Sequence, residues 1–183
     1  MSKPDSGHFR GTSGSNNSLK NLSQPTKSRA IILSEDYDTR EHPTKYKQMS
    51  TKKLKLLREK VQNRTITREE YKRLNWQIRL TARRNKAIKE FWEKEKSLIK
   101  NGLPTTRNWS AQQTLEILAG RKPKFKGKPM SSHHKYSVTK YPHLANRPEL
   151  IFPVTIYEHF FGWHGGNTRN SLPGKPINRI FEF

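Results

Sequence analysis

Residues 130–166 read MSSHHKYSVTKYPHLANRPELIFPVTIYEHFFGWHGG, and this stretch decides the fold of the C-terminal part of the chain. Met130–His134 is typical of the end of a strand, and Leu150–Val154 is a second, apolar strand after a loop that contains two prolines. Thr155 and Glu158 then form a capping box, the pairing of a threonine with a glutamate three residues later that begins a helix. The order of strand, loop, strand and helix predicts a small ββα unit.

Histidine is concentrated in the same stretch. Five of the seven histidines fall within 32 residues, namely His133, His134, His143, His159 and His164. The other two, His8 and His42, lie in the N-terminal third. Because the chain has no cysteine, a metal ion has to be held by histidine, carboxylate or amide groups.

The two adjacent histidines are expected to have different roles. Successive side chains of an extended segment point to opposite faces, so His133 and His134 are not expected to bind the same ion. One metal ligand and one general base is the division that fits this geometry. His159 on the helix and His164 just past its end are then expected to close the metal shell.

Three helices are predicted before this unit. Apolar residues at helical spacing predict a first helix between Ser50 and Asn63. A capping box at Thr67 begins a second, long and basic helix that ends at Asn101, and another capping box begins a short helix that ends at Gly120.

The charge of the chain indicates a polyanionic partner. The formal net charge is +22, from 37 Lys and Arg against 15 Asp and Glu, and only 31% of the residues are hydrophobic, which excludes a large core. Residues 51–100 carry 17 Lys and Arg against 6 Glu, which fits a surface that faces phosphates. The alternative interpretation of this charge is a solvated outer face with i,i+4 pairs such as Glu90 with Lys94.

No apolar run approaches the roughly 20 residues that a membrane-spanning helix needs.

The combination of the paired histidines with Glu158-His159-Phe160 and Trp163-His164-Gly165-Gly166-Asn167 is the most specific feature. With these motifs at these separations, residues 107–179 resemble the HNH/endonuclease VII superfamily of ββα-metal nucleases. They resemble in particular the C-terminal nuclease modules of bacterial polymorphic toxins with a Ser-His-His or Gly-His-His signature.

The resemblance implies a role for each histidine of the signature. His134 is implied as the general base that deprotonates the attacking water. His133, His159 and His164 are implied as ligands of one divalent metal ion, with Mg²⁺, Mn²⁺, Zn²⁺ and Ni²⁺ as the candidates. The candidates for phosphate contacts are Lys135, Arg147 and Arg169.

Two positions depart from the family pattern. Leu150 stands where the family usually has an asparagine, so Asn146, four residues earlier, is the candidate for the structural brace of the loop. His159 and His164 are five residues apart instead of four, which predicts that the helix ends near Gly162. His143 and Asn167 are alternative ligands in place of His164.

The expected fold class is α+β, with long basic N-terminal helices followed by a small ββα-metal module of the HNH type. Residues 1–30 are expected to be a disordered linker, because they are rich in Ser, Gly, Asn, Lys and Pro. Residues 31–104 are expected to form the basic helical extension and residues 105–183 the nuclease module. The aromatic residues of the module are expected to lie in its core: Phe152, Tyr157, Phe160, Phe161 and Trp163.

The function implied by the resemblance is that of a metal-dependent, largely nonspecific endonuclease on DNA. The resemblance also implies a toxic C-terminal module of a larger effector, which a bacterium secretes and which acts in the cytoplasm of the target cell. A cognate immunity protein, expected to be acidic, is the implied protein partner. The alternatives are a nuclease that acts on RNA and a nonenzymatic basic nucleic-acid-binding protein with a structural histidine–metal site.

Overall fold

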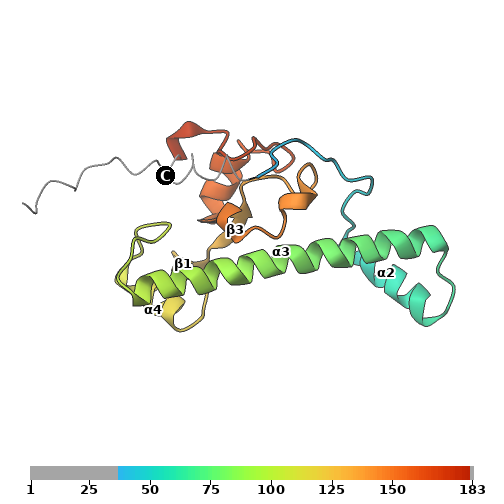
Figure 1. Cartoon of the computed structure of the whole chain (residues 1–183), viewed down its shortest axis with the longest axis horizontal. Helices are drawn as coiled ribbons and strands as arrows, with labels where there is room; N and C mark the ends of the chain where they lie inside the picture. Colours follow the sequence, from blue (N-terminus) through green and yellow to red (C-terminus); the bar gives the residue numbers. More distant parts are fainter. Residues whose placement is uncertain (1–36, 182–183) are drawn as a thin grey trace, which may run out of the picture. The chain divides into compact units, whose positions relative to one another are not determined.

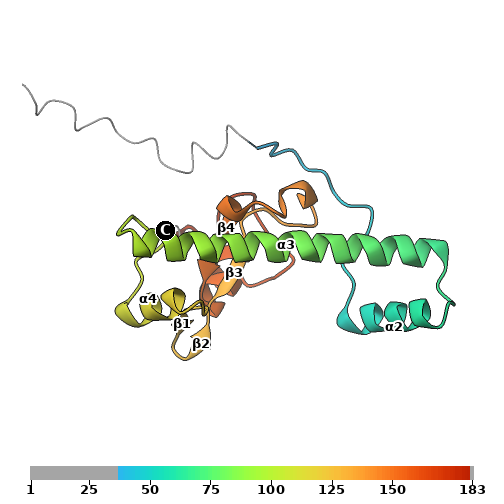
Figure 2. The ribbon, with the colours of Figure 1, turned by 60° about the horizontal axis from the view of Figure 1, so that its bottom comes forward.

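The longest element is α3, an α-helix of 33 residues over Arg68–Lys100 (Figure 1). Thr67 caps its N-terminus: the threonine side chain accepts a hydrogen bond from the backbone N–H of Glu70, whose carboxylate accepts one from the N–H of Thr67. Helix α2, Thr51–Gln62, lies along the first part of α3, and its Leu57 is fully buried (Figure 2). The helix boundaries predicted from the capping box and from apolar spacing are confirmed.

The computed structural model describes residues 37–181, which belong to one compact unit. The predicted linker over residues 1–30 lies outside the described residues. The division into an extension up to residue 104 and a nuclease module after it stays a prediction. None of the described helices combines the length and the apolar character that crossing a bilayer requires.

Helix α4, Ala111–Leu118, follows the second capping box, in which Ser110 accepts a hydrogen bond from the N–H of Gln113. The chain leaves this helix through Gly120, whose φ of +74° is a left-handed conformation that favours glycine. A short antiparallel hairpin comes next, formed by β1, Lys124–Phe125, and β2, Lys128–Pro129.

The predicted ββα unit is present. Strand β3, Ser131–His134, pairs antiparallel with β4, Ile151–Val154, and His133 lies opposite Phe152 in the register. The remaining elements are short helices: η1 (Pro142–Leu144) and η2 (Pro148–Leu150) in the connecting loop, η3 (Glu158–Trp163) after β4, and η4 (Arg179–Phe181). Long helices and small antiparallel sheets together confirm the α+β fold class.

One face of α3 packs against the ββα unit. Ala87 and Phe91 pack with Ile151 of β4, and all three side chains are buried. Nearer the N-terminus of the helix, Leu80 packs with Val138 and with other apolar groups of the loop between β3 and β4. Helix α3 therefore supports both the strand and the loop that hold the histidines.

The prediction of an aromatic core is correct for two residues and wrong for three. Phe152 and Trp163 are buried and pack together with Val154. Tyr157 is 61% exposed and Phe161 is 45% exposed, and Phe160 also lies at the surface. The reason is that η3 lies at the edge of the unit, so only the side of the helix that carries Trp163 is covered.

Candidate active site

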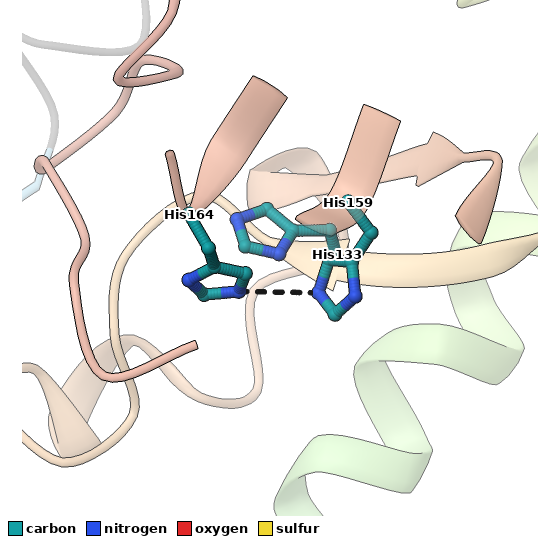
Figure 3. Close-up of side chains that lie close together, drawn as sticks. All are labelled: His133, His159 and His164. Atoms are coloured by element: carbon teal, nitrogen blue, oxygen red, sulfur yellow. Dashed lines mark hydrogen bonds between the residues drawn. The ribbon is translucent and has the colours of Figure 1, made fainter. Parts of the chain in front are cut away.

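Helix η3 is wound as a π-helix, and this winding sets the geometry of its two histidines. The backbone N–H of His164 donates to the carbonyl of His159 at 3.2 Å, the i to i+5 pairing of a π-helix. Residues five apart therefore lie on the same side of the helix, as Figure 3 shows for these two side chains. The prediction that the helix ends near Gly162 is confirmed, since η3 ends at Trp163, one residue further on.

Three histidines from two elements meet at this point. His133 comes from β3 and is buried, and one ring nitrogen from each of His133, His159 and His164 lies within 4.8 Å of the other two (Figure 3). The Nε2 atoms of His159 and His164 are 3.3 Å apart. Two nitrogens bound tetrahedrally at about 2.0–2.1 Å from one ion are also about 3.3 Å apart. The three side chains therefore fit a divalent cation that accepts imidazole ligands.

The hydrogen bond made by His164 fixes which of its nitrogens is available. Its Nδ1 lies 2.6 Å from the carbonyl oxygen of Asn170, and because a carbonyl only accepts, Nδ1 carries the proton. The lone pair is then on Nε2, which faces His159. A histidine that donates one ring N–H to a backbone carbonyl and offers the other nitrogen is the usual arrangement of a metal ligand.

Burial favours the neutral form that a metal ligand needs. Burial lowers the pKa of His133 far below its usual value, and the neighbouring histidines, first among them His159, lower it further. Burial also lowers the pKa of His159, with a smaller contribution from His164. His133 and His159 can therefore offer a lone pair without first losing a proton.

His134 points to the other side of β3 and has a different environment. Its Nε2 lies 3.2 Å from the carbonyl oxygen of Ala145 and must donate to it, so Nδ1 carries the lone pair. Burial lowers the pKa of His134 to about 4, and the charge of Arg84 contributes to this shift, while the bond to Ala145 opposes it. His134 is therefore neutral at pH 7 and able to accept a proton.

All four histidines open into one cleft of about 580 Å³, which is also lined by Arg84, Lys140 and Arg169, among others. The three-histidine cluster and His134 thus line the same cleft. Of the three phosphate contacts predicted from the sequence, Arg169 lines this cleft. Lys135 instead lies over the ring of Phe152, and Arg147 lies over the ring of Tyr37.

Arg84 is a cleft residue that sequence reasoning missed. It makes no hydrogen bond or ion pair within residues 37–181, and its Nε is buried without a partner there. The neighbouring Arg83 does have hydrogen-bond partners. Its Nη2 donates to the carbonyl of His143 at 2.8 Å and to Oδ1 of Asn146 at 2.9 Å. Nothing in the sequence distinguishes Arg84 from the other basic residues of α3, since only the packing of the helix turns it toward the cleft.

The candidate brace, Asn146, lies next to Ala145, the residue whose carbonyl holds His134. Its side chain accepts the hydrogen bond from Arg83, so it ties the loop to α3. Leu150, at the position where the family usually has asparagine, is buried with Tyr141 and Leu144.

The two alternative ligands have other contacts. His143 belongs to a separate group with Asp38 and His42, outside the three-histidine cluster. The side-chain oxygen of Asn167 accepts a hydrogen bond from the backbone N–H of Arg169.

A partly buried ion pair anchors the start of η3. Arg107 binds both carboxylate oxygens of Glu158 at 2.8 Å and also donates to the carbonyl of Pro153. The capping box is formed as predicted, since the N–H of Thr155 donates to Glu158 and the N–H of Glu158 donates to the hydroxyl of Thr155. Glu158 therefore fixes the helix that carries His159.

The basic surface of α3 is partly paired. Lys86 lies 3.7 Å from Glu90, and Lys89 lies 3.7 Å from Glu93, both at i,i+4 spacing. The pairing expected between Glu90 and Lys94 is replaced by the pairing of Glu90 with Lys86. Lys72 is paired with Glu69 as well, and within residues 37–181 the other Lys and Arg side chains of α3 have no acidic partner.

A comparison with protein families gives a match to part of the chain. The model of a family described as "GHH signature containing HNH/Endo VII superfamily nuclease toxin" matches residues 69–155. No curated protein matches the chain. The matched segment begins at the second residue of α3 and ends just after β4, so it includes His133 and His134 but not the histidines of η3. Residues 69–155 therefore match the GHH-signature family of nuclease toxins in the HNH/Endo VII superfamily.

Proposed function

We propose that the cleft is the active site of a metal-dependent endonuclease that hydrolyses phosphodiester bonds of DNA with little sequence preference. The observation that carries this proposal is the position of His134. His134 lines the same cleft as a separate cluster of three histidines that could hold a metal ion.

In the proposed reaction, His134 is the general base. Its Nδ1 takes a proton from a water molecule whose oxygen attacks the phosphorus, while the bond from phosphorus to the leaving oxygen breaks. The carbonyl of Ala145 holds the imidazole in the required tautomer and orientation. Solvent then protonates the leaving oxygen and takes the proton from His134.

The residues that would hold the metal ion are His133, His159 and His164. A divalent cation bound there supplies positive charge next to the phosphate that is cut. Arg84 and Arg169 are the proposed contacts to the same phosphate from the protein side. A guanidinium that is partly buried without an acidic partner is well suited to an anion, because binding the anion offsets the cost of its burial.

The proposed substrate is DNA, held through its backbone. Contacts between Lys or Arg and phosphates give affinity that does not depend on sequence. Most of the Lys and Arg side chains of α3, the helix that carries Arg84, have no acidic partner among the described residues. RNA is the alternative substrate, since it offers the same phosphates.

The toxin family supports a wider proposal about the setting of the enzyme. In this proposal the chain is the toxic C-terminal module of an effector that a bacterium secretes, and it acts in the cytoplasm of the target cell. The producing cell would protect itself with a cognate immunity protein. An acidic protein is the expected partner, because it has to mask a chain with a net charge of +22.

The experiment that tests the proposed reaction is an assay of DNA and RNA cleavage in parallel. Supercoiled plasmid and a structured RNA are incubated with the purified chain in Mg²⁺, Mn²⁺, Zn²⁺, Ni²⁺ or EDTA. The expected result is nicking of the plasmid with at least one metal and no nicking in EDTA. Binding of the plasmid at low salt without cleavage under any condition would instead support the nonenzymatic binding protein. Cleavage of RNA alone would correct the substrate.

A further inference from the structure

Residues 37–44, called the strap here, lie along the loop that joins β3 to β4. The N–H of His42 donates to the carbonyl of Lys140 at 2.9 Å, and the N–H of Thr44 donates to the carbonyl of Thr139 at 3.2 Å. An ion pair of 2.9 Å between Lys140 and Glu41 adds to this contact. The strap thus meets a segment that is about 100 positions further along the chain.

Three potential metal ligands meet where the strap crosses the loop. Asp38 and His42 come from the strap and His143 comes from η1, and their candidate ligand atoms lie within 4.8 Å of one another. His42 Nε2 is 2.9 Å from Oδ2 of Asp38, and the rings of His42 and His143 are 4.7 Å apart, edge to face.

The hydrogen bond of His143 provides a second, independent observation. Its Nε2 lies 2.7 Å from the backbone carbonyl oxygen of Asp38 and must donate to it. The lone pair is therefore on Nδ1, which is buried and has no hydrogen-bond partner in the described part of the chain. His164 of the active-site cluster also donates one ring N–H to a backbone carbonyl, through Nδ1 instead of Nε2, and such a contact is typical of a metal ligand.

We propose that Asp38, His42 and His143 form a second cation site, distinct from the cleft, and that the site takes Zn²⁺. Two imidazoles and one carboxylate are a ligand set that zinc commonly accepts, and water can complete the coordination. Arg40 already binds the Asp38 carboxylate through Oδ1 and Oδ2 at 2.9 Å. A carboxylate offers about four lone-pair positions, so this contact leaves room for a cation.

The expected role of the second site is to fasten the strap to the loop that positions the general base. The backbone carbonyl of His143 accepts a hydrogen bond from Arg83, and Ala145, two residues further on, holds His134. A cation that joins His143 to Asp38 would therefore limit the movement of the loop. This role does not require the chain to be a nuclease.

The proposal is tested by counting bound zinc. The full chain and its variants are dialysed against buffered Zn²⁺, and the metal per chain is measured by elemental analysis. The wild type is expected to bind two ions, the His42→Ala variant one, the His159→Ala variant one and the double variant none. The matched control is His8→Ala, a histidine outside the described residues, which is expected to keep both ions.

The results separate this site from the proposed active site. The second site would be overturned if the His42→Ala variant still bound two ions. It would also be overturned if the wild type bound a single ion and only His159→Ala removed it. A single ion that only His42→Ala removes would support the second site and overturn the metal centre of the cleft. Asp38→Asn and His143→Gln are used alongside His42→Ala, with circular dichroism to confirm folding, so that one unstable variant does not decide the result.

Discussion

Two neighbouring histidines of β3 have different surroundings because side chains alternate along a strand. His133 faces η3, where two more imidazoles approach it, and burial keeps it neutral. His134 faces the loop and α3, where the Ala145 carbonyl and Arg84 are its polar neighbours. A single dipeptide thus supplies one side chain to the metal cluster and one to the proposed proton transfer.

The role of Arg84 can be tested by removing its charge. Arg84→Ala is expected to lower the rate of plasmid cleavage by about 10²-fold or more, as the loss of one charged group at a developing negative charge typically does. Arg79→Ala is the matched control, because Arg79 is exposed on the same helix, and it is expected to cleave at nearly the wild-type rate. Equal rates for both variants, measured at saturating DNA, would exclude a role for Arg84 in the reaction.

Part of this site can be predicted from the sequence and part cannot. The clustering of histidines and the alternation of His133 and His134 are visible in the sequence. The meeting of His159 with His164 is also expected from the sequence, but the π-winding that places residues five apart on one side of the helix is not, because it has no clear signature. Arg84 is hidden for a different reason: its role depends on how α3 is rotated against the loop.

At the scale of elements, the capping boxes are the sequence patterns that predict the starts of helices most reliably. Thr67 and Ser110 begin their helices as expected, because a cap satisfies backbone groups locally and needs no tertiary contact. The exposure of Tyr157 and Phe161 was not predictable in this way. It depends on which side of η3 is covered, which is a property of packing and not of local sequence.

The ion pair between Arg107 and Glu158 is expected to hold η3 in place. The two side chains are 18% and 12% exposed, so Arg107→Ala leaves a carboxylate that is mostly buried without its partner. This substitution is expected to lower the free energy of unfolding by about 3 kcal/mol. The measurement is urea denaturation followed by circular dichroism.

The control for this prediction is Lys89→Ala, which removes an exposed partner of Glu93 and is expected to change stability by less than about 0.5 kcal/mol. If Arg107→Ala were no more destabilising than Lys89→Ala, the ion pair would not be what anchors the helix.

At the scale of the whole molecule, the charge of +22 predicts how DNA binding responds to salt. If six or more phosphates are neutralised, the affinity for duplex DNA is expected to fall by about 10³-fold or more between 50 and 200 mM salt. Fluorescence anisotropy with two unrelated duplexes of equal length measures this slope, and both duplexes are expected to give the same one. An affinity that hardly changes with salt would contradict binding through the phosphate backbone.

The central claim is that His134 is the general base of a nuclease, and the most direct measurement is plasmid nicking by the His134→Ala variant. We expect this variant to lose at least about 10²-fold in the rate of nicking, while its DNA affinity and its unfolding transition stay close to those of the wild type. His8→Ala, carried through the same assay, is expected to nick at the wild-type rate. Nicking by His134→Ala at the wild-type rate would contradict the assignment.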